Sequence, residues 1–406
     1  MESVTIEDVR AARARFDDES VVRTTAIESS RLLSDRSGAD VFLKMEHLQR
    51  TGSFKTRGAY NKLQRLAERS DVDRVVAASA GNHAQGVALA ATKSGIDSTV
   101  VMPTAAPQTK VDATRGYGAD VVLSGRSFQE ALAHAETLAE GDDVEFVHAY
   151  DDPDIVAGQG TIGLEIAEQV PDVDAVIVPI GGGGLIGGIA TALAGVAPDV
   201  RVIGVQAEDA ATVPESLDKG LPCGIGDPDT IADGIATGGI SELTFGLIRD
   251  HVDEVVTVTD QEIAHAVLVL LERTKQLVEG AGAASVAALS SPDLDVRGER
   301  IVAVLGGGNI DMSMLQTVLT HALADRSQLL RLRVRIDDRP GKMAELSGLI
   351  ADHGANIRSV RHDRAVDDLD VGDAYLVFQI VTSGASHADE IIRSIRDAGY
   401  EVEREN

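Results

Sequence analysis

Short apolar segments alternate with amphipathic ones along most of the chain. Runs rich in Val, Ile and Ala predict buried strands at residues 75–80, 98–101, 121–123, 176–180, 201–206, 253–258 and 301–305. Apolar residues with helical spacing between some of these runs predict helices at residues 83–91, 110–117 and 128–139. Repeated alternation of strand and helix is typical of an open, mostly parallel sheet with helices on both faces. We therefore expect an α/β body.

The pattern changes after Arg326. Apolar and charged residues then alternate over residues 330–337, which predicts a strand with one buried face. A turn at residues 338–341 follows, because Pro fixes its φ and Gly accepts a positive one. The remaining pattern predicts a helix at 343–350, strands at 356–361 and 374–381, a helix ending near Gly399 and a last strand at 400–402. This βαββαβ order predicts a ferredoxin-like unit of about 75 residues.

The composition excludes several kinds of partner. The 65 Asp and Glu residues outnumber the 37 Lys and Arg residues, so the net charge is −28 and a nucleic-acid backbone would be repelled. No apolar run approaches the roughly 20 residues that span a bilayer, and residues 1–16 lack the apolar core of a secretion signal. Cys223 is the single cysteine, which argues against a disulfide or a metal cluster. We expect a cytoplasmic protein without a membrane, nucleic-acid or metal partner.

The carboxylates are spread over the whole length, and only eight of the basic residues are lysines. Dispersed acidity with few lysines indicates a halophilic protein from a salt-rich cytoplasm, where screening relieves repulsion between like charges. An ordinary acidic protein is the alternative, and stability measured against KCl separates the two.

Lys55 is the first candidate for covalent chemistry. It lies between Phe54 and Thr56 in the glycine-bounded segment GSFKTRGA at residues 52–59. A partly desolvated amine with a lowered pKa at such a position can form a Schiff base. Taken alone, the segment leaves open that Lys55 is an ordinary surface lysine.

The second segment, SAGNHAQG at residues 79–86, follows a predicted strand directly and opens a helix. Free N–H groups at a helix start, the helix dipole and the side-chain amide of Asn82 suit a carboxylate. The alternative is that Asn82 only caps the helix, which would leave the rest of the small polar run unexplained.

The third segment, PIGGGGLIGG at residues 179–188, also follows a strand. Its consecutive glycines let main-chain N–H groups converge on a phosphate. The segment is also a formal GxGxxG through Gly182, Gly184 and Gly187, with Glu208 about 20 residues on, as a dinucleotide site requires. A fourth segment, LGGGNID at residues 305–311, follows the last strand of the body, at the sheet edge where parallel sheets place ligands.

Together these segments resemble the fold-type II pyridoxal-phosphate enzymes, and specifically the threonine ammonia-lyases. The resemblance is carried, in this order, by SFKTRGA, SAGNHAQG, PIGGGGLIGG, VEGAGAAS at residues 278–285 and GGGNID. The C-terminal βαββαβ unit with its DRPG turn resembles the ACT regulatory domain found on many of these enzymes. The likeness covers almost the whole chain.

The resemblance implies a domain organisation. Two open α/β subdomains of the tryptophan-synthase-β-like type would form a catalytic body at residues 1–326. The smaller subdomain would span about 53–150, and the larger would combine 1–52 with 151–326. The ACT domain would occupy residues 327–406, and the chain would form a homo-oligomer, a dimer or a tetramer.

The resemblance also implies residue roles. Lys55 would bind pyridoxal 5'-phosphate and later remove the substrate Cα proton, with Phe54 against the pyridine ring and Asn82 at the ring hydroxyl. The cofactor phosphate would be bound by Gly181, Gly182, Gly183, Gly184 and Leu185, and Gly306 would line the cofactor. The substrate carboxylate would be bound by Ser79, Ala80, Gly81, Asn82 and His83. The implied reaction is β-elimination of L-threonine to 2-oxobutanoate and ammonia, with L-serine as a further substrate.

Three features depart from the family patterns. Gly306 stands where the family usually has a serine facing the pyridine nitrogen, so that hydrogen bond is missing or comes from another group. Ala80 stands where the related serine racemases have a proton-donating serine, which favours elimination over racemisation. The racemase metal ligands align with Gln206, Ala210 and Thr212, so we expect no metal site. The alternatives are a serine racemase or serine dehydratase of the same fold, or a nucleotide-dependent oxidoreductase using residues 182–187.

The ACT resemblance implies an amino-acid effector, with isoleucine or valine expected. The effector would bind near the turn after the first strand, at Gly341, and near the start of the second, at Ala355, Asn356 and Ile357. The alternative is a purely structural unit that joins subunits through its sheet edges. The arginines at 331, 333 and 335 are expected to form a solvated strand face rather than a ligand site.

Overall fold

The protein is described here by a computed structural model, which covers residues 3–69 and 71–405. The chain divides into two compact units, Met1–Asp311 and Met312–Asn406. Helix α13 (Met312–Asp325) belongs to the second unit, whereas the predicted boundary at residue 326 assigned it to the first. No helix among the described residues is long and apolar enough to cross a membrane.

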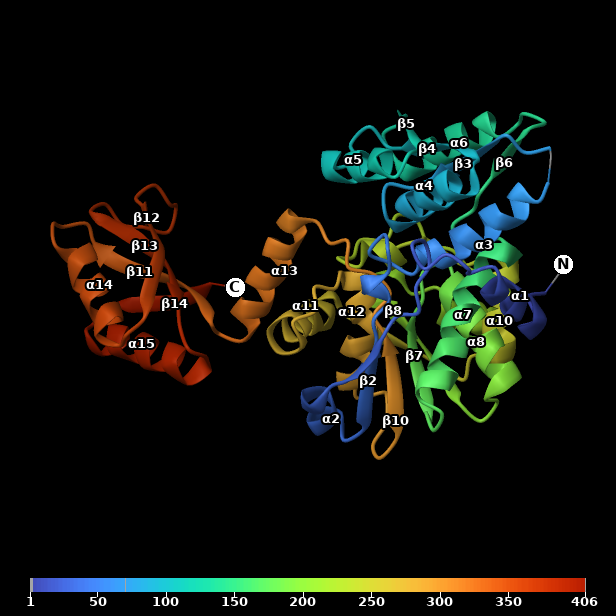
Figure 1. Cartoon of the computed structure of the whole chain (residues 1–406). Helices are drawn as coiled ribbons and strands as arrows, with labels where there is room; N and C mark the ends of the chain where they lie inside the picture. The colour runs from blue at the N-terminus through green and yellow to red at the C-terminus, as the bar shows by residue number, and fades with distance from the viewer. Residues whose placement is uncertain (1–2, 70, 406) are drawn as a thin grey trace. The chain divides into compact units, whose positions relative to one another are not determined.

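The first unit contains two sheets (Figure 1). The larger sheet has the order β1 (Ile27–Ser29), β2 (Asp40–Lys44), β10 (Arg300–Val304), β7 (Ala175–Pro179), β8 (Arg201–Ala207) and β9 (Glu254–Val258). The smaller sheet has the order β5 (Asp120–Leu123), β4 (Asp97–Met102), β3 (Arg74–Ala78) and β6 (Val144–Phe146). Strand β1 is antiparallel to β2, and the other pairings described in these two sheets are parallel. The expected pair of open, mostly parallel α/β subdomains is thereby confirmed.

Helices connect the strands of both sheets. The smaller sheet is accompanied by α3 (Lys55–Ala67), α4 (Asn82–Ser94), α5 (Gln108–Gly116) and α6 (Phe128–Leu138). The remaining helices of the unit are α1 (Ile6–Ala14), α2 (Arg31–Ser37), α7 (Pro153–Gln169), α8 (Gly184–Val196), α9 (Val213–Lys219), α10 (Glu242–His251), α11 (Asp260–Val269) and α12 (Gly280–Ala287). The three helices predicted at residues 83–91, 110–117 and 128–139 correspond to α4, α5 and α6.

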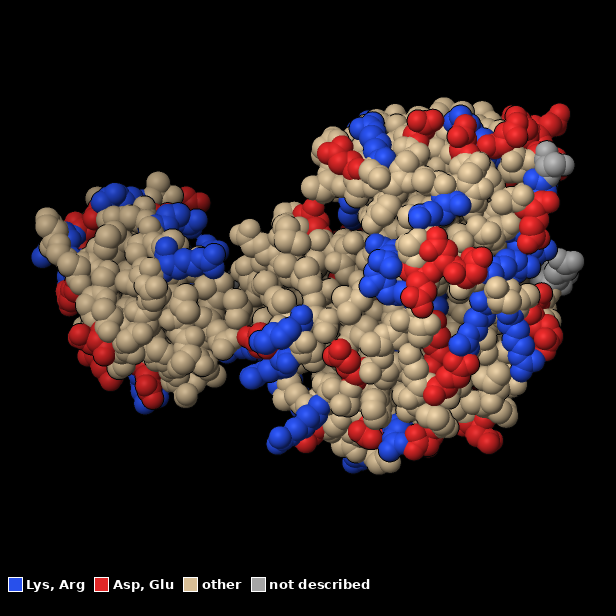
Figure 2. All heavy atoms as spheres, in the orientation of Figure 1, with Lys and Arg blue, Asp and Glu red and all other residues tan. Residues whose placement is uncertain are grey.

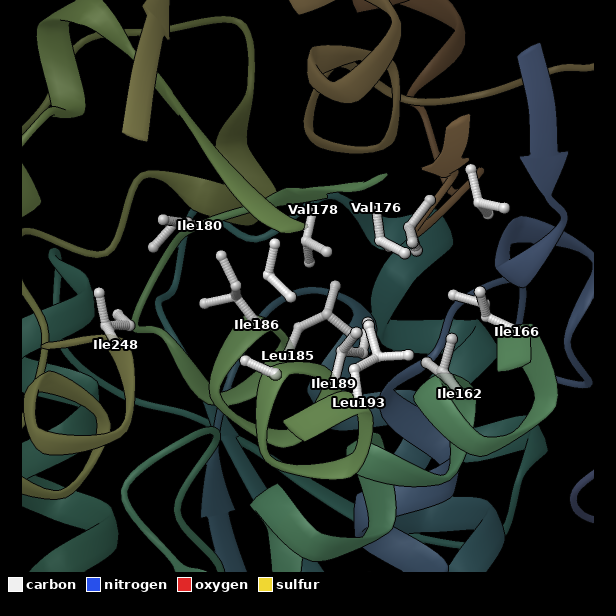
Figure 3. Packing of buried hydrophobic residues seen from close by; sticks show 14 of the residues in the cluster. Ile162, Ile166, Val176, Val178, Ile180, Leu185, Ile186, Ile189, Leu193 and Ile248 are labelled. Atoms are coloured by element: carbon white, nitrogen blue, oxygen red, sulfur yellow. The ribbon is translucent and has the colours of Figure 1, made fainter. Parts of the chain in front are cut away.

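The main hydrophobic core packs α7 and α8 against β7 (Figure 3). Strand β7 is buried on both faces, which explains its unbroken apolar sequence. Helices α7 and α8 approach closely through glycines, because a Cβ on Gly160 would lie 2.8 Å from the carbonyl oxygen of Gly188. This packing positions α8, whose first residue, Gly184, is the last of the four consecutive glycines.

Four charged side chains are buried where α3 meets the larger sheet. Arg57 of α3 donates to Glu46 (2.7 and 2.8 Å) and to Glu165 of α7 (2.6 and 2.9 Å). Lys44, the last residue of β2, donates to Glu165 (2.6 Å). The side chains of Arg57, Glu46 and Lys44 are 0% exposed and that of Glu165 is 6% exposed. The cluster is neutral and attaches α3, which begins at Lys55, to the larger sheet.

The second unit has the predicted βαββαβ order. After α13 come β11 (Leu329–Asp337), α14 (Lys342–Asp352), β12 (Asn356–Asp363), β13 (Asp373–Val381), α15 (Ala385–Asp397) and β14 (Glu401–Glu405). They form an antiparallel sheet in the order β12-β13-β11-β14. Its apolar face, with Leu332, Val334, Leu376 and Phe378, packs on the two helices, among whose buried residues are Leu346 of α14 and Ile391 of α15.

The arginine-bearing face of β11 is covered by carboxylates. Arg333 lies 3.6 Å from the Tyr375 ring centroid and pairs with Asp368. Arg335 pairs with Asp370 and Asp373, and Arg331 pairs with Glu405. The three arginines remain partly exposed, as expected of a solvated strand face, and their charge is balanced by an acidic loop at residues 366–372 and by strand β14. On the face of the first unit drawn in Figure 2, acidic and basic side chains are interspersed, without a single-sign patch.

Candidate active site

The candidate site lies where loops after strands β3, β6, β7 and β10 come together around Lys55. Parallel strands present their carboxyl ends at one edge, so loops far apart in sequence meet there. The loop after β10 reaches the α3 start directly, since the Phe54 N–H donates to the Gly306 carbonyl (3.0 Å). Ser53 also forms a β-bridge with Gly307.

Lys55 is the first residue of α3 and its amine is partly buried. Its Nζ donates to the carbonyl oxygen of Ala149 (3.0 Å) and lies 5.2 Å from the centroid of the Phe54 ring. No carboxylate of the described residues forms an ion pair with it. Burial lowers the pKa of Lys55 to about 8, while the negative charge of Glu279 acts in the opposite direction. The amine is therefore far easier to deprotonate than an ordinary lysine.

The loop after β6 was not identified from the sequence. Its Ala149 carbonyl accepts from Lys55, and its Val147 carbonyl bonds the Nε2 atom of His83 (2.9 Å). Tyr150 stands edge-on to the ring of His148, with 4.6 Å between centroids and an interplanar angle of 82°. Strand β6 has only three residues, too few for a periodic signal, and this is why the loop was missed.

His83 is a neutral residue of this site. Burial, together with the charge of Lys55, lowers the pKa of His83 to about 3. Because Nε2 faces a carbonyl oxygen, the proton of the neutral ring is on Nε2. The Nδ1 atom is buried and has no partner among the described residues.

The four-glycine loop connects β7 to α8. Gly183 has φ +87°, a conformation that favours glycine. A Cβ at Gly182 would collide with the ring of Tyr150, so the loop and the 147–150 segment are in close contact. Thr244 of α10 holds the loop by donating to the Gly182 carbonyl (2.8 Å). The N–H groups of residues 181–183 donate to no described residue.

The first N–H groups of α8, at Gly184 and Leu185, add to this set because a helix start has no intrahelical acceptors for them. Five consecutive N–H groups are therefore available to an anion at the positive end of a helix dipole. This arrangement suits a phosphate.

Asn82 is the first residue of α4 and does not cap it, because Gly81 occupies the N-cap without a side-chain bond. The capping alternative is thus wrong. Asn82 Nδ2 donates to Glu279 Oε1 (2.6 Å), and Asn82 Oδ1 accepts from Asn309 Nδ2 (2.7 Å). Burial raises the pKa of Glu279, and the hydrogen bond from Asn82 opposes that shift. The sequence assigned no role to Glu279 or Asn309.

Gly306 lies beside two other predicted cofactor residues. A Cβ built at Gly306 would contact the Phe54 ring at 3.4 Å and a Leu185 methyl group at 3.8 Å. The position therefore faces apolar atoms. Ser79 and Ala80 lie in the loop after β3, where Ser79 Oγ accepts from the Gly81 N–H (3.1 Å).

The positions aligned with racemase metal ligands make a local hydrogen-bonded turn. Gln206 Oε1 accepts from the N–H groups of Thr212 (3.1 Å) and Val213 (2.9 Å). Within the described ranges, no group of three or more His, Cys, Asp or Glu side chains is placed to hold a metal ion.

The predicted effector positions are separated in the second unit. Gly341, at φ +97°, precedes α14, while Ala355, Asn356 and Ile357 follow it. Helix α14 has 11 residues, so its ends are about 16 Å apart at 1.5 Å per residue. One copy of the chain does not bring these positions into a single site.

Comparison with known families gives two matches. Residues 19–307 match the pyridoxal-phosphate dependent enzymes, and residues 330–399 match the ACT domain. The first match decides against the nucleotide-dependent oxidoreductase that the GxGxxG pattern had left open. Glu208, which that alternative required, is exposed.

Individual relatives agree with the family match. The L-threonine ammonia-lyase of Thermotoga maritima is 45% identical over 399 residues, 98% of this chain and 99% of the relative. The processed form of threonine deaminase isoform 2 from Solanum lycopersicum superposes with a TM-score of 0.74 at 37% identity, covering 79% of this chain and 90% of that one. Maize serine racemase has a TM-score of 0.74 at 33% identity, covering 80% and 100%. This chain belongs to the pyridoxal-phosphate-dependent enzymes and carries an ACT domain at its C-terminus.

Proposed function

We propose that this enzyme deaminates L-threonine to 2-oxobutanoate and ammonia by β-elimination, and also acts on L-serine. The observation that carries the proposal is the Lys55 amine, half-buried, without a carboxylate partner in the described part of the chain and joined through the 147–150 segment to the four-glycine loop. The relative named for threonine deamination, at 45% identity over nearly the whole chain, supports the substrate.

The residues present fit pyridoxal phosphate. Lys55 offers an amine for the aldehyde, and residues 181–185 offer five main-chain N–H groups for the phosphate. Phe54 offers an apolar face for the ring. The orphaned buried atoms Ser53 Oγ and His83 Nδ1 lie in the same segments and leave polar groups for a bound molecule to satisfy. When bound, the cofactor supplies the electron sink that stabilises negative charge at the substrate Cα.

The residues of the chain would then position the substrate and move protons. The Lys55 amine would take the Cα proton, a task for which a pKa near 8 suits a base at neutral pH. The free N–H groups at the start of α4 receive the substrate carboxylate, next to Asn82 and neutral His83. Phe54 and Leu185 exclude water from the reacting face.

Elimination is favoured over racemisation by two features of this chain. Ala80 has no proton to transfer to the opposite face of Cα. The side-chain oxygen of Gln206 accepts hydrogen bonds from two backbone N–H groups, so it is not free to bind a metal. A serine racemase of the same fold is the second candidate, because such an enzyme superposes equally well.

Regulation and physiology are further parts of the proposal. The ACT domain supports allosteric control by an amino acid, isoleucine or valine, as expected of an enzyme of isoleucine biosynthesis. Gly341 and Ala355 lie beyond opposite ends of α14, a helix about 16 Å long, which supports a site shared between subunits of a homo-oligomer. The net charge of −28 supports a halophilic enzyme of a salt-rich cytoplasm.

Incubation with pyridoxal phosphate and either L-threonine or L-serine tests the function by the release of 2-oxo acid and ammonia. Lys55→Ala should lose about a thousandfold or more of the rate, since the covalent group and the base disappear together. Lys62→Ala, on the same helix but in ion pairs with Asp152 and Glu145, serves as the matched control. D-serine formed without 2-oxo acid would favour the racemase, and no product from either substrate would refute the proposal.

A further inference from the structure

Three polar side chains form a chain of hydrogen bonds beside Lys55, and two of them have no role in the function proposed above. Asn309 donates from Nδ2 to the Thr51 carbonyl (2.6 Å) and to Asn82 Oδ1 (2.7 Å). Asn82 donates in turn to Glu279 Oε1 (2.6 Å). These hydrogen bonds thus join the loop after β10 to the starts of α4 and α12.

The hydrogen bonds can run in only one direction. An ionised carboxylate accepts and does not donate, so the side of Asn82 facing Glu279 is its NH2 group. Asn82 Oδ1 then faces Asn309, whose NH2 group must lie toward it and toward the Thr51 carbonyl, another pure acceptor. The acceptors at both ends of this series of hydrogen bonds, Glu279 and the Thr51 carbonyl, therefore require the same orientation of the two amides. The second N–H of the Asn82 amide takes part in none of these hydrogen bonds.

The backbone leaves room for these three side chains. A Cβ at Gly307 would collide with Glu279 Oε1, and a Cβ at Gly52, where φ is +76°, would collide with Asn309 Oδ1. The Glu279 backbone N–H donates to the Gly307 carbonyl (3.1 Å). Glu279 is the N-cap residue of α12, but its carboxylate makes no capping bond. Helix capping therefore does not explain this carboxylate.

We propose that Glu279 and Asn309 are positioning residues that hold the Asn82 amide with its NH2 group toward the bound cofactor. The proposal rests on the proposed function, because the acceptor for the remaining N–H is the ring oxygen of pyridoxal phosphate. Glu279 also places a negative charge near the amine of Lys55.

The charged groups that act on Glu279 are Lys110 of α5 and Asp233 of the short 3-10 helix Asp233–Ile235, while Glu279 itself acts on Lys55 of α3. Burial raises the pKa of Glu279, and Asp233 adds to that shift, whereas Asn82 and Lys110 oppose it. Asp233 accepts no bond from Asn82, so Asp233→Asn removes a neighbouring charge and leaves the chain of hydrogen bonds intact.

A double-mutant cycle tests whether Glu279 acts through Asn82. The dissociation constant of pyridoxal phosphate is measured by equilibrium dialysis for wild type, Glu279→Ala, Asn82→Ala and the double variant, with Asp233→Asn as control. Glu279→Ala should weaken binding about tenfold in the wild-type background and less than twofold in the Asn82→Ala background. Asn309→Ala should behave like Glu279→Ala, and Asp233→Asn should stay within twofold of wild type. Equal losses in both backgrounds, or no loss at all, would overturn the proposal.

A second readout uses the apoprotein and Glu279→Gln, which keeps the shape and an acceptor but removes the charge. The pH dependence of reductive methylation at Lys55, followed by mass spectrometry, reports the amine. Its midpoint should move to lower pH in Glu279→Gln, because a carboxylate favours the protonated amine. An unchanged or higher midpoint would contradict the placement of Glu279. If wild type fails to bind the cofactor at Lys55, the proposed function fails instead, so the two failures are distinguishable.

Discussion

Replacing Arg57 by Met should destabilise the protein by about 3–5 kcal/mol, the usual cost of leaving a buried charge without its partner. Arg57 and Lys44 offset Glu46 and Glu165 in a cluster that water does not reach. Without Arg57, two buried carboxylates share the ammonium of Lys44, and the guanidinium's six hydrogen bonds are lost. The loss should also loosen α3, whose first residue is Lys55.

Urea unfolding followed by far-UV circular dichroism measures the change, because the chain has no tryptophan to report by fluorescence. Arg201→Met is the matched control. Arg201 bonds Glu299 at 2.6 Å, yet its side chain is 35% exposed, so its removal should cost at most about 1 kcal/mol. A loss in Arg57→Met no larger than in the control would refute the reasoning.

A double variant tests whether uncompensated charge causes the loss of stability in Arg57→Met. Adding Glu165→Gln to Arg57→Met leaves Lys44 and Glu46 as a neutral pair, so the double variant should lose less than the two single losses combined. The penalty of Arg57→Met should also shrink at lower pH, because a surplus buried carboxylate takes up a proton. Additive losses and a pH-independent penalty would show that packing, and not charge, sets the cost.

Four further outcomes follow from the structure. Gly182→Ala should weaken pyridoxal phosphate binding about tenfold or more, because its Cβ would collide with the Tyr150 ring; Gly226→Ala, with open space around it, should not, and equal binding by both would contradict the loop geometry. The pKa of His83 is about 3 in the folded protein and near 6.5 in the unfolded chain, so between these values the unfolded state binds more protons. Lowering the pH from about 6.5 to about 3 should therefore reduce the free energy of unfolding, by up to about 1.4 kcal/mol per pH unit. Urea titrations of His83→Asn should show that slope reduced by about one proton, and an unchanged slope would count against a buried neutral ring. Arg333→Ala should speed proteolysis of residues 366–372 while changing stability by less than about 1 kcal/mol, since the contacts are half-exposed; unaltered cleavage would mean that the arginine does not hold the loop. Raising KCl should increase the unfolding midpoint of this chain of net charge −28, and full stability in dilute buffer would argue for an ordinary acidic protein.

The sequence identified the elements whose signal is local. Strands β3, β4, β7, β8 and β10 each contain a run of apolar residues, and their predicted bounds lie within two residues of the observed ones. Strands β1, β2 and β6 were not predicted. Strands β1 and β6 have three residues each, and the apolar pattern of β2 ends in the buried Lys44. Burial of that lysine depends on Glu165, 121 residues away, and no local pattern encodes such a partnership.

The candidate site likewise contains residues with a local sequence signal and residues whose contacts appear only in the fold. Asn82 and the four glycines stand in short segments that directly follow strands, and Lys55 stands in the short glycine-bounded segment 52–59, so their chemistry was readable. Glu279 and Asn309 lie in segments that the resemblance included, but their link to Asn82 spans 197 and 227 residues and appears only in the fold. The collision at Gly182 likewise reflects Tyr150, in a loop that follows a strand too short to predict.

The proposed function requires that Lys55 binds the cofactor covalently and that the four-glycine loop binds its phosphate. Borohydride reduction of the enzyme loaded with pyridoxal phosphate, followed by peptide mapping, identifies the lysine that binds the cofactor. We expect a pyridoxyl phosphate group on Lys55 in wild type, and its loss in Lys55→Ala. A group on any other of the eight lysines, or on none, would contradict it.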